Sequence, residues 1–456
     1  MEQLAAMDAS FLYFETPSMP QHVLGVMVLD AEGTTFTREG FRKVLEERLH
    51  LLPAFTRTLL EVPLHLDHPY WVREHDVVLD EHLSFRTCPA PGDLRALGDL
   101  VGEIGTGLLD RSRPLWEIHV VDGLEGGQVA LVAKLHHATL YGAAGADMMA
   151  NLLDLEPAVG VVDAAPELPV EDHPSTVSLI AKAGVHGLRR PAVAVRGVLG
   201  GVRRIGTLPG AALASVRTPP RSLINGQLTP TRQAAFATLD LEQLKAVKNA
   251  YGVKVNDVVL AAVTEVLRDY LIARGGLPKK PLVATVPMNL GAGQAAGTNT
   301  IANLLVPLPV LTEDRVARLH EVAAASQGQK DASESLGPEA LSQFMGLVPP
   351  LLIKGGASVF EGLRLQRLLP PLLSLVVSNM QGPPIPLYCG GARVTAVYPM
   401  GPLIPSSGLN LTVLSNMGKM DVGLLCCPDL VPDVWDIVEG LPGAVQALLD
   451  AAPDAA

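Results

Sequence analysis

The chain has 456 residues, more than one hydrophobic core usually serves, so we expect two domains. Its formal net charge of −12 argues against general nucleic-acid binding, because neutralising phosphates needs a basic surface. Hydrophobic residues make up 48 % and charged residues only 18 %, which indicates a chain that buries much apolar surface or contacts lipid.

The amino-terminal part alternates segments typical of strands and helices. Residues 22–30 and 129–137 are strand-like, whereas 36–52 and 93–109 have apolar residues at helical spacing. This alternation predicts a first domain of α/β or α+β type over residues 1–160. The amino terminus has no basic, apolar secretory signal and the chain has no long continuous apolar run, so we expect a cytoplasmic protein without a transmembrane helix.

Residues 161–232 are predicted to form a linker rich in Pro and Arg. No Asp or Glu occurs from His173 to Leu239, where nine positive side chains leave about −21 for the rest of the protein. The segment could form a basic amphipathic helix on anionic lipid, although its glycines weaken a helix. It could equally be a connector whose arginines face acidic surfaces of the two domains. The nine residues are Lys182, Arg189, Arg190, Arg196, Arg203, Arg204, Arg217, Arg221 and Arg232.

Residues 233–456 are predicted to form a second α/β domain. Helices are expected near 239–252, 255–276 and 312–329, the last beginning at Thr312, with a final short helix near the carboxyl end. The remaining apolar segments are typical of buried strands separated by Gly and Pro. The glycines at 291–297 approach a dinucleotide fingerprint but have the wrong spacing and precede a predicted strand, so a glycine loop is favoured.

The sequence contains no nucleophile elbow, no P-loop and no HExxH motif. His65 and His68 in HLDH have no evident third ligand and are expected in a surface loop. The cysteines show no CxxC spacing and no neighbouring histidines, so they are expected to be reduced thiols in the core. They are Cys88, Cys389, Cys426 and Cys427.

Two adjacent histidines, His136 and His137, end the predicted strand 129–137 and precede a run of small residues. A histidine at the end of a buried strand is well placed as a general base, since its pKa lies near working pH. Small residues beside it would let a substrate approach. From these residues alone, the alternative also stays open that the two histidines form a hydrogen-bonded structural pair without a catalytic role.

Six further segments occur in one order along the chain: MDASFLYFE, LPAFTRTLL, LDRSRPLWEIHVVDGL, VNDVVLAAV, SNMQGPP and PDLVPD. Together with the histidine pair they resemble the bacterial wax ester synthase/acyl-CoA:diacylglycerol acyltransferase family. That family lies within the superfamily of chloramphenicol acetyltransferase, plant acyltransferases and condensation domains. The resemblance covers nearly the whole chain, and LDRSRPLWE followed by HH and an internal ND is specific as a set.

The resemblance implies two chloramphenicol-acetyltransferase-like α/β domains with mixed sheets and an active-site tunnel at their interface. It also implies O-acylation of diacylglycerol or a fatty alcohol by acyl-CoA, a substrate, with no cofactor or metal. His136 and His137 would open the family's HHxxxDG motif, and His137 would be the general base. Peripheral contact with a membrane or lipid-droplet surface rests on the acid-free arginine segment, where it is the alternative to a connector between the domains.

The resemblance also suggests roles for residues beyond the histidines. Asn256 of the ND pair would support the tunnel and a developing oxyanion, whereas Asp257 would cap or orient a helix. Gly142 would let the chain turn close to the site. The PLWE residues are expected to be structural: Pro114, Leu115, Trp116 and Glu117.

The sequence departs from the family where HHxxxDG requires an aspartate, because this position is Tyr141. A phenol, titrating near 10, supplies no carboxylate at neutral pH, although its hydroxyl can form hydrogen bonds. Four outcomes of this replacement stay open: near-normal activity, weakened activity, an altered choice of substrate, and loss of the catalytic function. The alternatives to an enzyme are a family member that only binds acyl-CoA or lipid, and a membrane or droplet interaction protein. A second departure is SNMG at Ser415 to Gly418, where a tyrosine is expected after the serine.

Overall fold

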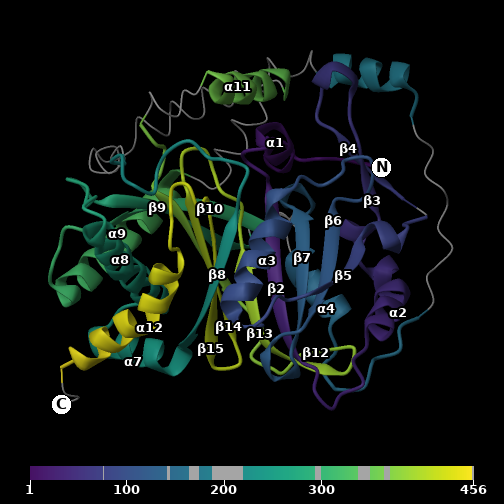
Figure 1. Ribbon diagram of the computed structural model, residues 1–456. Coiled ribbons are helices and arrows are strands. Elements are labelled where there is room, and N and C mark those ends of the chain that lie inside the picture. Colours follow the sequence, from purple (N-terminus) through teal and green to yellow (C-terminus); the bar gives the residue numbers. More distant parts are fainter. Residues whose placement is uncertain are drawn as a thin grey trace.

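A computed structural model of the chain describes residues 1–74, 76–140, 144–163, 174–186, 219–292, 299–336, 350–363 and 370–453. These residues form two six-stranded mixed sheets with helices packed on them, and a three-stranded sheet at one end (Figure 1). The fold is therefore mixed α/β with two large sheets, as the sequence predicts.

The first large sheet has the strand order β12-β13-β2-β7-β6-β5. Its helix α3 packs in the same core as residues of β2 and the second sheet, whereas α2 and α4 cover the opposite face. The strands are β2 (His22–Asp30), β5 (Leu83–Thr87), β6 (Trp116–Asp122), β7 (Val129–His136), β12 (Tyr388–Cys389) and β13 (Ala392–Met400), and the helices are α2 (Arg38–Arg48), α3 (Leu94–Thr106) and α4 (Ala144–Leu152).

The second large sheet has the order β10-β9-β11-β14-β15-β8, and four helices pack with it in the largest hydrophobic core. The strands are β8 (Gln233–Asp240), β9 (Leu282–Ala292), β10 (Asn299–Leu308), β11 (Leu375–Gln381), β14 (Leu409–Asn416) and β15 (Lys419–Cys426). The helices are α7 (Leu241–Tyr251), α8 (Val255–Ala273), α9 (Arg315–Leu336) and α12 (Trp435–Asp450).

The third sheet and its neighbours lie at the end of the molecule where the candidate site is found. The sheet has the order β1-β4-β3, and helix α11 lies beside α1 above it (Figure 1). These elements are β1 (Glu2–Gln3), α1 (Ala6–Phe14), β3 (Arg57–Leu60), β4 (Tyr70–Arg73) and α11 (Pro350–Gly362). Short 3-10 turns are η1 (Leu49–Leu51), η2 (Pro53–Phe55), η3 (Pro63–His65), η4 (Leu79–Glu81), η5 (Glu125–Gly127) and η6 (His137–Thr139).

The two halves of the chain are interlocked through a shared sheet. Strand β13 comes from the carboxyl-terminal half but pairs with β2 along most of its length. A hydrogen bond also joins the two large sheets: the buried Asp421 of β15, in the second sheet, accepts at 2.9 Å from the Val397 amide of β13, in the first. The first sheet therefore contains strands from both halves of the chain. Strand β8, the first strand of the second sheet along the chain, starts at the predicted boundary near residue 233.

Helix α3 approaches the second sheet closely because it has glycines at the contact. A Cβ at Gly98 would lie 2.5 Å from the Ala234 carbonyl oxygen, and one at Gly102 would lie 2.5 Å from that of Arg232. Real Cβ atoms do not approach backbone this closely, so any larger residue would push the two halves apart. These glycines fix the distance between the two halves.

Two expectations about local structure are wrong. Helix α9 begins at Arg315, not at Thr312, because Asp314 accepts a hydrogen bond from the Ala317 amide and serves as the N-cap. His68 does not lie in an exposed loop: it is 8 % exposed, and its Nδ1 lies 2.9 Å from the Tyr13 hydroxyl. The four cysteines are buried and free, as expected.

Most of the predicted linker lies outside the described residues, as do its arginines between 189 and 217 and residues 293–297 of the glycine run. The described part includes a helix over residues 176–186. Arg232 is buried, and its guanidinium donates hydrogen bonds to the carbonyl oxygens of Thr229, Thr231 and Ser18. This arginine thus joins the two halves through carbonyls, not through acidic side chains. Within the described ranges, every helix is too short or too polar to cross a membrane.

Candidate active site

The backbone of the histidine pair is held by both neighbouring strands of the first sheet. Strand β7 ends at His136, whose amide donates to the Leu115 carbonyl oxygen at 3.0 Å, just before β6. The His137 amide donates at 2.8 Å to the carbonyl oxygen of Gln21, the residue before β2. The chain then turns into η6, so the two imidazoles leave the strand end in different surroundings.

His136 is fully buried and both of its ring nitrogens face protein groups. Its Nδ1 accepts a hydrogen bond of 3.1 Å from the Ala138 amide. Its Nε2 lies 3.3 Å from Oε1 of Glu15. Since Nδ1 is an acceptor, the neutral ring carries its proton on Nε2, which lies beside the carboxylate but outside hydrogen-bond geometry. His136 is thereby occupied as a structural group.

His137 has the surroundings of a proton acceptor. Its half-buried ring stacks on Phe11, with centroids 3.8 Å apart and planes 20° apart. Its Nδ1 has no hydrogen-bond partner in any other residue that the structure describes. Burial, followed by the charge of His136, lowers the pKa of His137 from 6.5 to about 4, opposed only by its own backbone carbonyl. The imidazole is therefore neutral at neutral pH and has a lone pair to accept a proton.

A buried acid that the sequence reasoning did not single out lies behind the pair. Glu15 follows α1, its side chain is 3 % exposed, and Oε1 also lies 3.3 Å from Nε2 of His22. Its Oε2 pairs with Arg111 at 2.9 Å. Burial alone would raise the pKa of Glu15, but the two histidines hold it well below the usual range. Glu15 lies within MDASFLYFE and Arg111 within LDRSRPLWE. Both segments carry the family resemblance, so the sequence did contain a signal for these two residues.

The PLWE residues support the sheet beside this cluster. Trp116 is buried between the rings of Phe55 and His82, at centroid distances of 4.2 and 4.4 Å, and its Nε1 donates to the Phe55 carbonyl oxygen at 3.0 Å. Leu115 is the residue whose carbonyl oxygen receives the His136 amide. Pro114 precedes both, and its carbonyl oxygen accepts from the Trp116 amide at 2.9 Å.

Glu117 occupies a polar row that continues across the sheet. It lies 3.5 Å from the buried Lys134 ammonium and 3.4 Å from His119. Burial alone would raise its pKa, but these two partners lower it to about 2. Burial also lowers the pKa of Lys134, against the opposing effect of Glu117. The carboxylate of Glu117 and the ammonium of Lys134 balance each other's charge, which suits a structural role.

Asn256 and Asp257 begin helix α8 in the other half of the chain and have separate contacts. Asp257 accepts a hydrogen bond of 2.9 Å from the Lys254 amide, which caps the helix. Oδ1 of Asn256 accepts at 3.2 Å from Nδ2 of Asn379, in the SNMQGPP segment of β11. Tertiary structure thus joins these two distant segments. No hydrogen bond joins Asn256 to His137 among the described residues.

Tyr141 and Gly142 lie outside the described residues, so their predicted roles stay predictions. The described part of the chain contains no group of three or more His, Cys, Asp or Glu residues arranged to hold a metal ion.

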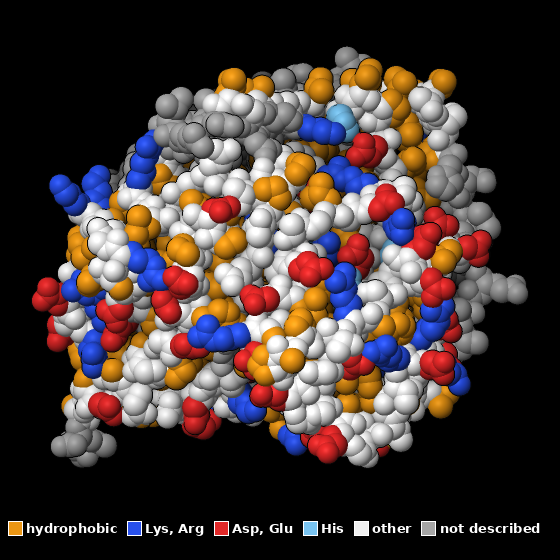
Figure 2. All heavy atoms as spheres, viewed as in Figure 1, with side chains coloured by type: hydrophobic (Ala, Val, Ile, Leu, Met, Phe, Trp, Pro, Cys, Tyr) orange, Lys and Arg blue, Asp and Glu red, His pale blue; other side chains and the backbone are white. Residues whose placement is uncertain are grey.

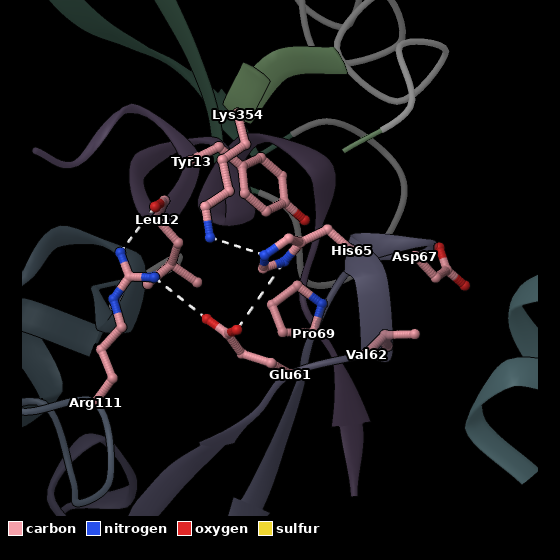
Figure 3. Close-up of a pocket in the computed structure, with 9 residues that line it drawn as sticks. All are labelled: Leu12, Tyr13, Glu61, Val62, His65, Asp67, Pro69, Arg111 and Lys354. Carbon is pink, nitrogen blue, oxygen red and sulfur yellow. Dashed lines mark hydrogen bonds and ion pairs between the residues drawn. The ribbon is translucent and has the colours of Figure 1, made fainter. Parts of the chain in front are cut away.

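Arg111 also lines a small pocket (Figure 3). Lys354 of α11 points into it and donates to Nε2 of His65 at 2.8 Å, and the other ring nitrogen of His65 lies 4.0 Å from Glu61. Glu61 also pairs with Arg111 at 3.3 Å. A continuous polar chain therefore connects α11 to the arginine that binds Glu15.

Comparison with known proteins gives a consistent result. Residues 4–259 match the family model of the wax ester synthase/diacylglycerol acyltransferase catalytic domain, and 297–448 match that of its C-terminal domain. A Mycobacterium tuberculosis protein provisionally named a diacylglycerol O-acyltransferase is 35 % identical, over 100 % of this chain and 91 % of its own length.

Two solved structures share the fold. The wax ester synthase/diacylglycerol acyltransferase from Marinobacter aquaeolei VT8 is 26 % identical, with a TM-score of 0.70 and coverage of 99 % of this chain and 100 % of that one. The first condensation domain of the calcium-dependent antibiotic synthetase is 17 % identical, with a TM-score of 0.58 and coverage of 99 % and 96 %. The second likeness concerns the fold alone.

Proposed function

The chain belongs to the wax ester synthase/diacylglycerol acyltransferase family, and from this membership we propose that His137 is the base of an acyl transfer from acyl-CoA to a hydrophobic alcohol. The protein is an acyltransferase of the diacylglycerol O-acyltransferase/wax ester synthase type. The observation that supports the role of His137 is its neutral, stacked ring beside a histidine whose Nδ1 is hydrogen-bonded and whose Nε2 lies at ion-pair distance from Glu15.

The proposed reaction needs one proton acceptor and no covalent acyl-enzyme. The neutral imidazole of His137 removes the proton from the alcohol hydroxyl as the hydroxyl oxygen attacks the thioester carbonyl carbon. The tetrahedral intermediate collapses, the carbon–sulfur bond breaks, and the imidazolium returns the proton to the leaving thiolate. The products are an ester and free coenzyme A, so His137 ends in its starting state.

The developing oxyanion needs a donor that is already in place. Asn256 is the proposed donor because Asn379 binds its Oδ1 and so leaves the Nδ2 hydrogens free to face a ligand. The acyl chain and the alcohol would meet in a tunnel between the two halves of the chain. Triacylglycerol or a wax ester would be the product, depending on the alcohol.

Turnover of labelled acyl-CoA with diacylglycerol and with hexadecanol tests the proposal. Ester should form with at least one alcohol and should disappear in His137→Ala. If the wild type forms no product above this variant while still binding acyl-CoA, the protein acts as a lipid-binding member of the family.

The effect of residue 141 needs its own variant. Tyr141→Asp restores the family motif, and we expect it to raise turnover if the usual carboxylate still has a partner here. An unchanged rate and unchanged thermal stability would mean that this protein has replaced the carboxylate by other contacts.

We further propose that one end of the molecule contacts a lipid surface, because the acceptor alcohols partition into lipid. Three segments there expose apolar side chains: η3 and the residue after it, helix 176–186, and α11 with the residue after it (Figures 1 and 2). We call these residues the apolar face: Leu64, Leu66, Val177, Ile180, Val185, Leu351, Val359 and Leu363, each between 40 % and 77 % exposed.

Charge favours an anionic lipid as the partner of the apolar face. Helix 176–186 has no acidic residue and carries Lys182, and it lies in the acid-free stretch from His173 to Leu239. The helix is held on the body of the protein by Leu179 and Ala183, which pack against Val62 and Tyr70. Its apolar and basic side chains could therefore act together at a membrane surface.

Cosedimentation with vesicles tests this contact. Binding to phosphatidylglycerol vesicles should exceed binding to phosphatidylcholine and should weaken as salt rises. The double variant Leu64→Asp/Val177→Asp should reduce it severalfold, whereas Ile272→Asp on α8, also an exposed apolar position, should not. Equal losses in both variants, or no binding by the wild type, would contradict the proposal.

A further inference from the structure

Glu15 contacts the histidine segment through more than one route. Its Oε1 lies 3.3 Å from Nε2 of His136. The same oxygen accepts from the Gln21 amide at 3.3 Å, and the Gln21 carbonyl oxygen accepts from the His137 amide at 2.8 Å. One carboxylate oxygen therefore reaches the side chain before the proposed base and, through one residue, the backbone of the base itself.

Helix α1 adds a third route. Phe11, which stacks on His137, lies one turn before Glu15, and the Glu15 amide donates to the Phe11 carbonyl oxygen at 3.1 Å. The helix end thus presents a ring to His137 and a carboxylate to His136. The guanidinium of Arg111 binds this helix end as well, donating to Oε2 of Glu15 and to the Leu12 carbonyl oxygen.

The carboxylate of Glu15 lies at ion-pair distance from Nε2 of His136, without hydrogen-bond geometry, and its negative charge favours a proton on that nitrogen. The Ala138 amide, immediately after His137, donates to Nδ1 of His136, which requires an unprotonated Nδ1. An acceptor at Nε2 favours the proton there and so keeps Nδ1 free for Ala138. If the acceptor at Nε2 were neutral, the other tautomer would compete, and the Ala138 contact and the turn η6 would loosen.

We propose that Glu15 is the positioning residue of the histidine motif, orienting His137 through the tautomer of His136 and through Gln21. It acts through other residues and does not touch the reacting atoms. This role rests on the proposed function, because it presupposes that His137 is the base. It also gives the segment a carboxylate, from residue 15, in a chain whose motif has Tyr141 at the usual acid position.

Glu15→Gln tests the proposal, with Glu61→Gln as the matched control. Glu61 shares Arg111 as a partner but contacts neither His136 nor His22. We expect Glu15→Gln to lower kcat about 10- to 100-fold, the usual cost of losing an outer-shell partner, with little change in KM. Glu15→Asp should recover part of the loss, and Glu61→Gln should stay near the wild type.

A second readout does not depend on turnover. Nitrogen-15 spectra of histidine-labelled protein should show His136 as the Nε2-protonated tautomer in the wild type and in Glu61→Gln, and a tautomer mixture in Glu15→Gln. Thermal unfolding confirms that each variant is folded. Wild-type kcat together with an unchanged tautomer in a folded Glu15→Gln protein would overturn the proposal. An inactive wild type with the expected tautomer change would instead contradict the role of His137.

Discussion

The rings of Phe11 and His137 lie nearly parallel, with 3.8 Å between their centroids, so helix α1 covers one face of the proposed base. The stacked ring of Phe11 closes that face of the imidazole. Its pKa is lowered to about 4, chiefly because it is buried here.

Replacing His137 by Gln should remove the proton acceptor while keeping a polar side chain of similar size. We expect kcat to fall about 100- to 10,000-fold, the range for general acid–base groups. His50→Gln, in η1 outside the histidine cluster, is the control and should retain activity. A His137→Gln rate within threefold of the wild type would exclude His137 as the base.

The rate should depend on pH in the way that the lowered pKa of His137 dictates. The neutral, active imidazole predominates above a pKa of about 4, so kcat/KM should stay nearly constant from pH 8 to about 5 and fall below that. Short assays after a pH jump separate this loss from unfolding. A midpoint near the ordinary value of 6.5 would show that the site is more hydrated than its burial implies.

The stability of the fold should decrease on acidification, and this decrease should begin at a higher pH than the loss of activity. Burial also lowers the pKa of His22 to about 4, so between about 6.5 and 4 the unfolded chain binds protons at residues 22 and 137 that the folded protein does not. The free energy of unfolding should therefore decrease as the pH falls through this window. Urea titrations at several pH values measure the slope, and His22→Gln should make it shallower. An unchanged slope in that variant would count against a neutral His22.

Asn256→Ala should separate oxyanion support from simple packing. If the amide donates to the oxyanion, kcat falls by about 100- to 1,000-fold with little loss of stability. Asn379→Ala, which only frees the Asn256 amide to rotate, should have a smaller effect, and the double variant should be no worse than Asn256→Ala. Equal and additive effects of the two single variants would indicate that the pair only joins α8 to β11.

Trp116→Phe should lower stability more than activity. The change keeps a ring between Phe55 and His82 but leaves the buried Phe55 carbonyl oxygen without its indole donor. We expect a loss of about 1–3 kcal/mol in the free energy of unfolding. Trp435→Phe is the control, because its indole nitrogen has no hydrogen bond within the described residues. A large kcat loss at unchanged stability would instead give Trp116 a direct role.

Much of the fold follows from local pattern. The strand expected at residues 22–30 is β2, and the helix expected at 93–109 contains α3, because alternating and helical apolar spacing reflect one buried face each. Pairing across the chain has no such local signature. The insertion of β13 beside β2 joins residues more than 350 positions apart, and no periodicity within either segment could predict it.

The sequence by itself determined the family, the order of its motifs and the histidine pair as the candidate site, because these depend on residue identity and spacing along the chain. The family resemblance already pointed to His137 as the base, but only the tertiary structure gave a physical difference between the two histidines, since that difference depends on what surrounds each ring. His136 accepts a hydrogen bond from Ala138 and lies at ion-pair distance from Glu15, whereas His137 has a stacked, neutral imidazole. Solvation and hydrogen bonding at a buried nitrogen depend on groups from distant segments, and folding alone brings those groups together.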